Sequence, residues 1–117
     1  MIRASVAVLL FGYATVGYSA TTDCEGSSYE RALCWYVAGE LDLAEEGFAE
    51  VVGSGGQEPE VLRAIYFLSR TKMRQQEYEE ASRLLIELFE LSPAFFRDWS
   101  GDYLLGICMS RSERGAS

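Results

Sequence analysis

Residue types on which many enzymes and metalloproteins depend are scarce in this chain of 117 residues. It has no histidine, the commonest general base and the commonest metal ligand. Its three cysteines, Cys24, Cys34 and Cys108, lie far apart and fit no zinc or redox spacing. We therefore expect no catalytic residues, no metal and no cofactor. Because the number of cysteines is odd, at least one thiol is unpaired within a monomer.

Positive charge is scarce as well. Ten lysines and arginines face 18 acidic residues, which gives a net charge of −8 and a pI near 4.5. This charge argues against partners such as nucleic acid or anionic membrane surfaces. The hydrophobic content of 49% is sufficient for the core of one small domain.

The first 20 residues differ in character from the rest. An apolar run follows Arg3 and ends in small residues, Ser19 and Ala20, which resembles a secretory signal peptide. The run is interrupted by Gly12 and is short for a membrane span. Two interpretations stay open for residues 1–20: a cleaved export signal and a retained apolar arm. Residues 21–26 form a polar linker.

The remaining sequence predicts an all-α domain at residues 27–109, because every segment with clear periodicity has the period of a helix and none has that of a strand. Ser27 and Glu30 have capping-box spacing, Pro59 suits a helix start, and Pro93 suits a helix end. We expect helices at 28–38, 41–52, 59–74 and 77–91, and one more within 94–109. The residues after them, 110–117, are polar and are expected to fray.

Two of these helices share a pattern. A small alanine, Ala44 or Ala81, stands in the middle of an apolar stripe with the same spacing of large residues on each side. Such a repeat predicts an antiparallel stack of helix pairs in which the alanines lie at close helix contacts. The stripes consist of Leu41, Ala44, Phe48 and Val51 in one helix and of Tyr78, Ala81, Leu85 and Leu88 in the other.

Two motifs suggest chemistry but have simpler explanations. The "GSGG" segment at 53–56 lacks the lysine and the preceding strand of a phosphate-binding loop, so we interpret it as a connector. Paired glutamates such as Glu45-Glu46 and Glu79-Glu80 fall on the polar sides of amphipathic helices, where a solvated surface is expected.

A binding surface is predicted on the first helix of each pair. Three arginines on one side of a single helix are unusual in so acidic a chain, and with neighbouring aromatics they suit a protein or peptide ligand that carries acidic residues. We expect the side chains of Arg70 and Arg74 to end in solvent. The alternative is that the arginines merely pair with nearby glutamates such as Glu60, Glu77 or Glu79. The predicted surface comprises Tyr29, Leu33, Tyr36, Arg63, Tyr66, Arg70, Met73 and Arg74.

The segments "GELDLAEEGFAEVV" and "QQEYEEASRLLIELFELSP" resemble the second helix of the tetratricopeptide repeat (TPR). With "YERALCWYV" and "LRAIYFLSRTKMR" before them, residues 29–93 are similar to the mitochondrial fission 1 adaptor family. That resemblance implies two repeats and a terminal helix in a right-handed superhelix. It also implies a non-catalytic adaptor at the mitochondrial outer surface that recruits division machinery.

The chain departs from that family at its end, "CMSRSERGAS", because no apolar segment there suits a C-terminal membrane anchor. The alternative function is therefore an exported TPR protein, periplasmic or secreted, that acts in envelope complex assembly. Export would allow a Cys24–Cys34 disulfide, whereas a cytosolic chain would keep three free thiols. The sequence identifies neither the partner nor the oligomeric state.

Overall fold

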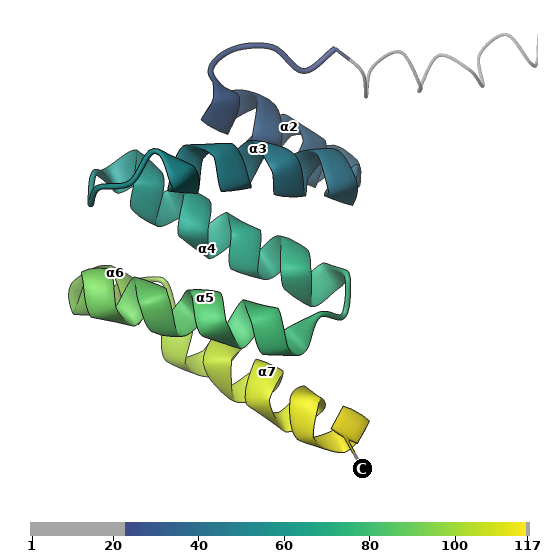
Figure 1. The fold of residues 1–117 in the computed structure, drawn as a ribbon, viewed down its shortest axis with the longest axis vertical. Helices are drawn as coiled ribbons and strands as arrows, with labels where there is room; N and C mark the ends of the chain where they lie inside the picture. Colours follow the sequence, from purple (N-terminus) through teal and green to yellow (C-terminus); the bar gives the residue numbers. More distant parts are fainter. Residues whose placement is uncertain (1–22, 117) are drawn as a thin grey trace, which may run out of the picture.

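The computed structural model describes residues 23–116, with side chains to residue 113. Within this part of the chain every regular element is a helix, which confirms the all-α prediction. Figure 1 shows the longer helices following one another from top to bottom. They are α2 (Ser28–Ala38), α3 (Leu41–Gly53), α4 (Pro59–Arg74), α5 (Tyr78–Leu91), α6 (Pro93–Asp98) and α7 (Gly101–Ala116).

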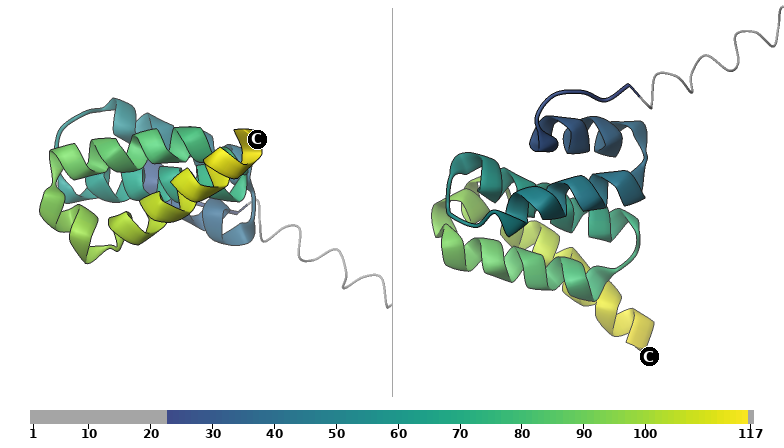
Figure 2. Two further views of the ribbon diagram at one scale, coloured as in Figure 1. Left: turned by 90° about the horizontal axis from the view of Figure 1, so that it is seen from below. Right: turned by 45° about the horizontal axis from the view of Figure 1, so that its top comes forward.

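Each long helix packs against its neighbours in the sequence. α2 contacts α3, α3 contacts α4, α4 contacts α5, and α5 contacts α7, while short α6 lies beside the end of α5. The right-hand view in Figure 2 shows the same layered order, with short connections that reverse the chain between helices. α4 is the central layer and contributes more buried residues than any other helix.

The predicted helix ends are confirmed where capping residues in the sequence marked them. The Ser27 side-chain oxygen accepts a hydrogen bond from the Glu30 amide at 3.2 Å, and Glu30 Oε1 accepts one from the Ser27 amide at 3.0 Å. This is the capping box expected from the sequence. α2 ends at Gly39, whose φ of 88° suits a residue without a side chain.

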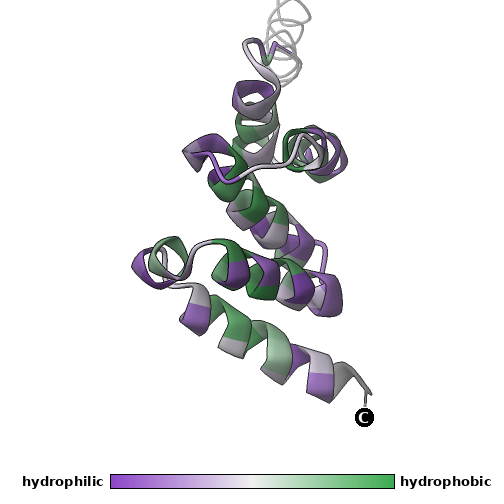
Figure 3. Ribbon diagram, turned by 60° about the vertical axis from the view of Figure 1, so that its left-hand side comes forward, coloured by the Kyte–Doolittle hydropathy of each residue, from purple (hydrophilic) through white to green (hydrophobic). Residues whose placement is uncertain are grey.

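Small residues allow the helices to approach closely. Ala44 and Ala81 are fully buried, as their position in the apolar stripes predicted. Gly47 was not singled out by the sequence, but a Cβ atom added there would lie 2.7 Å from the Cβ of Ala32 on α2. α2 and α3 can therefore pack at this distance only because position 47 has no side chain. Figure 3 shows hydrophobic and hydrophilic residues alternating around the helices.

The prediction of a single helix within residues 94–109 is wrong, because the structure has two helices there. α6 begins after Ser92, whose hydroxyl accepts a hydrogen bond from the Phe95 amide at 3.2 Å. It stops before Ser100, whose φ of 60° is left-handed and turns the chain into α7. Gly101 lies against the ring of Phe96, where a side chain would collide. The continuous apolar spacing of the segment concealed this break.

The polar tail is part of the last helix. α7 continues through Ala116, and whether its last turn frays stays a prediction. The Arg111 guanidinium lies 5.7 Å from the ring centroid of Tyr78 and donates a hydrogen bond to its hydroxyl at 3.3 Å. This contact fastens the last turns of α7 to the start of α5.

The structure contains a disulfide between Cys24 and Cys34, whose Cα atoms are 5.7 Å apart. It joins the segment before α2 to the middle of that helix. Cys108 is the remaining thiol; it is fully buried, and burial raises its pKa. No helix within the described residues is long and apolar enough to span a bilayer. The leader at residues 1–20 lies outside the described residues.

Candidate functional site

The predicted surface residues gather on the side of α4 that faces α2 and the turn between α6 and α7. Tyr66 is buried there, with its ring centroid 4.9 Å from that of Trp99. Phe67 is 5.5 Å from Tyr36 and 6.2 Å from Trp99, again between ring centroids. A continuous layer of aromatic rings therefore connects α2, α4 and the residue after α6, and it supports the arginines of α4.

Each of the three arginines predicted on this side is associated with a tyrosine. Arg70 lies 5.7 Å from the ring centroid of Tyr66 and donates a hydrogen bond to its hydroxyl at 2.8 Å. Arg74 lies 4.9 Å from the ring centroid of Tyr36 and donates to its backbone carbonyl at 3.1 Å. Contacts of this kind restrain a guanidinium without neutralising its charge.

The third pair is at the opposite end of α4. Arg63 lies 5.6 Å from the ring centroid of Tyr29. Burial raises the pKa of the Tyr29 phenol, and the neighbouring Arg63 opposes that rise. Leu33 lies between Tyr29 and Tyr36 in the sequence of α2; it is half-buried and packs on the core.

Pairing of these arginines with glutamates is not what the structure shows. Among the described residues, the ion pairs involve Lys72, Arg83 and Arg97, and no carboxylate lies within 4.0 Å of Arg63, Arg70 or Arg74. The expectation that both Arg70 and Arg74 end in solvent is wrong for Arg70, which is half-buried on Tyr66. Arg74 is exposed. A charge reversal at Arg70 would therefore disturb packing as well as charge.

Three arginines meet in one pocket of about 250 Å³ between α4 and α7. We call it the arginine pocket. α4 and α7 supply its walls, and the first residue of α5 closes it. Its lining residues are Arg70, Met73, Arg74, Tyr78, Ile107 and Arg111. None of these residues is acidic, so the pocket is a local concentration of positive charge in a chain whose net charge is −8.

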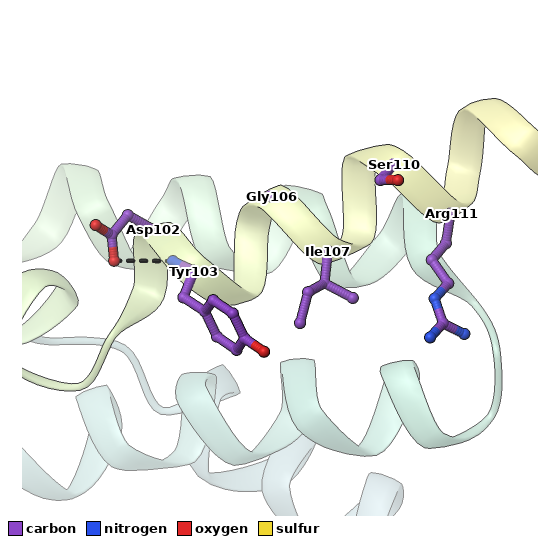
Figure 4. Close-up of a pocket in the computed structure, with 6 residues that line it drawn as sticks. All are labelled: Asp102, Tyr103, Gly106, Ile107, Ser110 and Arg111. Atoms are coloured by element: carbon purple, nitrogen blue, oxygen red, sulfur yellow. Dashed lines mark hydrogen bonds between the residues drawn. The ribbon is translucent and has the colours of Figure 1, made fainter.

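A second pocket, of about 530 Å³, shares Ile107 and Arg111 with the arginine pocket and runs along α7 (Figure 4). Figure 4 shows Tyr103, Ile107 and Arg111 pointing from the same side of α7. Tyr103 is 69% exposed, which is high for a large aromatic side chain. Together the two pockets form a groove along α7, with Tyr103 and Ile107 in its wall, Arg111 where the two pockets meet, and the acidic Asp102 at the far end.

The structure thus unites some of the predicted residues and separates others. Arg70, Met73 and Arg74 lie together in the arginine pocket, whereas Tyr29 and Leu33 do not line it. Arg111 was missed because it stands in the polar segment that was expected to fray. Its spacing of four residues from Ile107 was the available signal.

The other side of α4 has a different electrostatic environment. Lys72 has only 13% of its side chain exposed and lies 2.7 Å from Glu45, 3.5 Å from Glu77 and 3.3 Å from Glu80. Burial alone would lower the pKa of Lys72, but hydrogen bonds to Glu45 and Glu80 raise it to about 12. We call these four residues the lysine cluster. It joins α4 to α3 and to the start of α5.

The lysine cluster offers no site for a ligand, since its carboxylates already surround an ammonium group. No cluster of acidic or cysteine side chains within residues 23–116 has the geometry to hold a metal ion. Comparisons with protein-family models, with curated proteins and with solved structures find no significant match. Among the surfaces described above, the groove that ends in the arginine pocket is the strongest candidate for a functional site.

Proposed function

We propose that the chain is a non-catalytic adaptor that binds an acidic segment of a partner protein in the groove between α4 and α7. The contrast between its cations carries this proposal. Lys72 is surrounded by three carboxylates, whereas Arg70, Arg74 and Arg111 are held by tyrosines and have no carboxylate among the lining residues of the arginine pocket. Arg111 alone also borders neighbouring pockets that contain carboxylates, those of Asp102, Glu77, Glu79 and Glu80. Restrained guanidiniums with unused N–H donors suit ligand carboxylates.

The architecture that we propose is TPR-like. α2 and α3 would form one repeat, α4 and α5 a second, and α6 with α7 the terminal element of a right-handed superhelix. The sequential packing of the helices supports this assignment. So does the burial of Ala44 and Ala81 at equivalent positions of α3 and α5.

The cellular setting belongs to the same proposal. The Cys24–Cys34 disulfide favours an exported adaptor over one at the mitochondrial outer surface, because disulfides persist mainly in oxidising compartments. Protein isolated from its own cells and denatured without reductant should then have one free thiol, that of Cys108. Three free thiols would support the fission-adaptor setting in the reducing cytosol.

Binding is tested by neutralising the pocket without reversing its charge. Arg70→Gln combined with Arg74→Gln keeps polar side chains of moderate size, which limits the disturbance around Tyr66. The matched control combines Glu79→Gln with Glu87→Gln on the exposed side of α5. The partner would be captured from native lysate by tagged wild type, identified, and then purified.

Titration of the purified partner against each variant supplies the result. We expect the pocket variant to lose at least about tenfold in affinity, equivalent to about 1.4 kcal/mol, at unchanged helicity. The α5 variant should bind as wild type does. Equal affinity of the pocket variant and wild type would contradict the proposal, and loss only in the α5 variant would move the site to the acidic helices.

A further inference from the structure

The groove has an imbalance of hydrogen-bonding groups that restricts the form of its ligand. The arginine pocket is rich in donors, because each of its three guanidiniums carries several N–H groups. Its one side-chain acceptor is the hydroxyl of Tyr78, which already accepts a hydrogen bond from Arg111. The other acceptors of the groove, the Asp102 carboxylate and the Tyr103 and Ser110 hydroxyls, lie in the pocket along α7, so a ligand segment in the arginine pocket itself must supply the acceptors.

An extended peptide meets this requirement less well than a helix does. Its backbone N–H groups would find no free side-chain acceptor in the arginine pocket and would have to pair with water there. An α-helix pairs its own N–H groups with its own carbonyls and presents only side chains. Side chains that end in carboxylates would bring the acceptors that the three arginines lack.

The spacing of the groove residues is compatible with a helix. Arg70 and Arg74 are one turn apart on α4, and Ile107 and Arg111 are one turn apart on α7, which is a rise of about 6 Å in each case. Two carboxylates one turn apart on a ligand helix have the same separation. Alternate residues of a strand are about 7 Å apart and would also reach, so the hydrogen-bonding balance decides between the two forms.

Apolar groups complete the match. Met73 is half-buried between Arg70 and Arg74, and Ile107 is half-buried across the pocket. Tyr103 extends the apolar wall along α7 and is largely exposed (Figure 4). Leucines placed three residues after each carboxylate of a helix fall on the same face, because residues three and four apart are neighbours there.

We infer that the partner enters the groove as an amphipathic α-helix, with two carboxylates one turn apart for Arg70, Arg74 and Arg111 and with apolar residues for Met73, Ile107 and Tyr103. This inference rests on the proposed adaptor function and deepens it, since it states the conformation and side-chain pattern of the bound segment. The occupant is a segment of another protein, chosen by its charge complementarity to the pocket.

The test uses two synthetic peptides with a fluorescent label. The first is an alanine-rich peptide with glutamates at positions i and i+4 and leucines at i+3 and i+7. The second is identical except for one central alanine replaced by proline, which breaks the helix and leaves the charges in place. Fluorescence anisotropy measures the affinity of the full chain for each, and circular dichroism confirms their helicity.

We expect the helical peptide to bind at least about tenfold more tightly than the proline peptide. Arg111→Gln should weaken the helical peptide severalfold, as should Arg74→Gln. Arg83→Gln, at an exposed position of α5, is the matched control and should leave affinity unchanged.

The outcomes separate the inference from the proposed function. Equal binding of both peptides, still weakened by Arg70→Gln with Arg74→Gln, would overturn the helical ligand but keep the acidic adaptor. Binding that none of the pocket variants weakens would overturn both. Absence of binding by either peptide would overturn the helical ligand with these side chains, and the purified partner would then decide the adaptor function.

Discussion

α4 carries cations on both of its sides, and the two sides use them differently. On one side Lys72 joins α4 to α3 and α5 through three carboxylates, so its charge is compensated by ion pairs within the chain. On the other side Arg70 and Arg74 rest on tyrosines, so their charge is supported but not neutralised. The difference shows that two cations on one helix are distinguished by whether carboxylates lie beside them.

The choice of residue type agrees with this difference. A lysine ammonium is a compact charge that can be surrounded by several carboxylates, as in the lysine cluster. An arginine guanidinium is planar, stacks on an aromatic ring, and keeps donors at its edge for a second partner. Lysine in place of the pocket arginines would lose that stacking.

The largest expected loss of stability comes from a substitution in the hydrophobic core, on which both sides of α4 depend. Leu85 on α5 is fully buried. Leu85→Ala should lower the free energy of unfolding by about 2–5 kcal/mol, because it removes buried methyl groups and leaves a cavity. Urea denaturation followed by circular dichroism measures it. An unchanged midpoint would mean that α5 does not hold the stack together.

Removing the disulfide tests the stability of the side of α4 that carries the arginines. It fixes the start of α2, the helix that supplies Tyr29 and Tyr36 to the arginines, and does not touch the lysine cluster. Replacing Cys24 and Cys34 by serine should cost about 2–3 kcal/mol of unfolding free energy, because the crosslink closes a short loop. Chemical denaturation of oxidised and substituted protein compares them. Equal midpoints would show that the crosslink adds nothing to the stability of α2.

Two matched substitutions, one on each side of α4, compare directly how much each cation stabilises the fold. Lys72→Met should destabilise the fold by about 2 kcal/mol, since it leaves three carboxylates without their cation; their partial exposure to water limits the cost. Arg74→Met should cost only about 0.5 kcal/mol, the value of an exposed cation–ring contact. Thermal melting ranks the two. Equal losses, or a larger loss for Arg74→Met, would contradict the division of roles.

The smallest expected effect is a dependence on pH confined to the lysine cluster. A hydrogen bond from Lys72 holds the pKa of Glu45 below its ordinary value of 4.5, against the opposing effect of burial. Glu45 therefore stabilises the fold above that pH, and this contribution is lost as the pH falls through its lowered pKa. The Lys72 contribution is complete below 10.5 and is lost as the pH rises through about 12.

The measurement is the urea midpoint at acidic and neutral pH for wild type and Lys72→Met. The variant should show a weaker loss of stability in acid, because the hydrogen bond that lowers the pKa of Glu45 is gone. Arg74→Met serves as the control and should follow wild type. Identical acid dependence in all three proteins would contradict the assignment.

The sequence by itself determined the helices before residue 92 and their buried sides. Period, capping residues and prolines are local signals, so α2 and α4 begin and end where the sequence placed them. Ala44 and Ala81 could be assigned to close contacts because an alanine within an apolar stripe leaves room only for another helix. The stripe of arginines on α4 was visible for the same reason, since helical spacing fixes which residues share a side.

Only the tertiary structure decided what faces those residues. The left-handed Ser100 divides the last helix in two, and a single residue's backbone angle leaves no trace in apolar spacing. That turn sets α7 against α5 and places Arg111 in the pocket with Arg70 and Arg74. Whether a cation meets a carboxylate or a tyrosine ring depends on residues distant in the chain. Lys72 and Arg74 are therefore similar in the sequence and different in the fold.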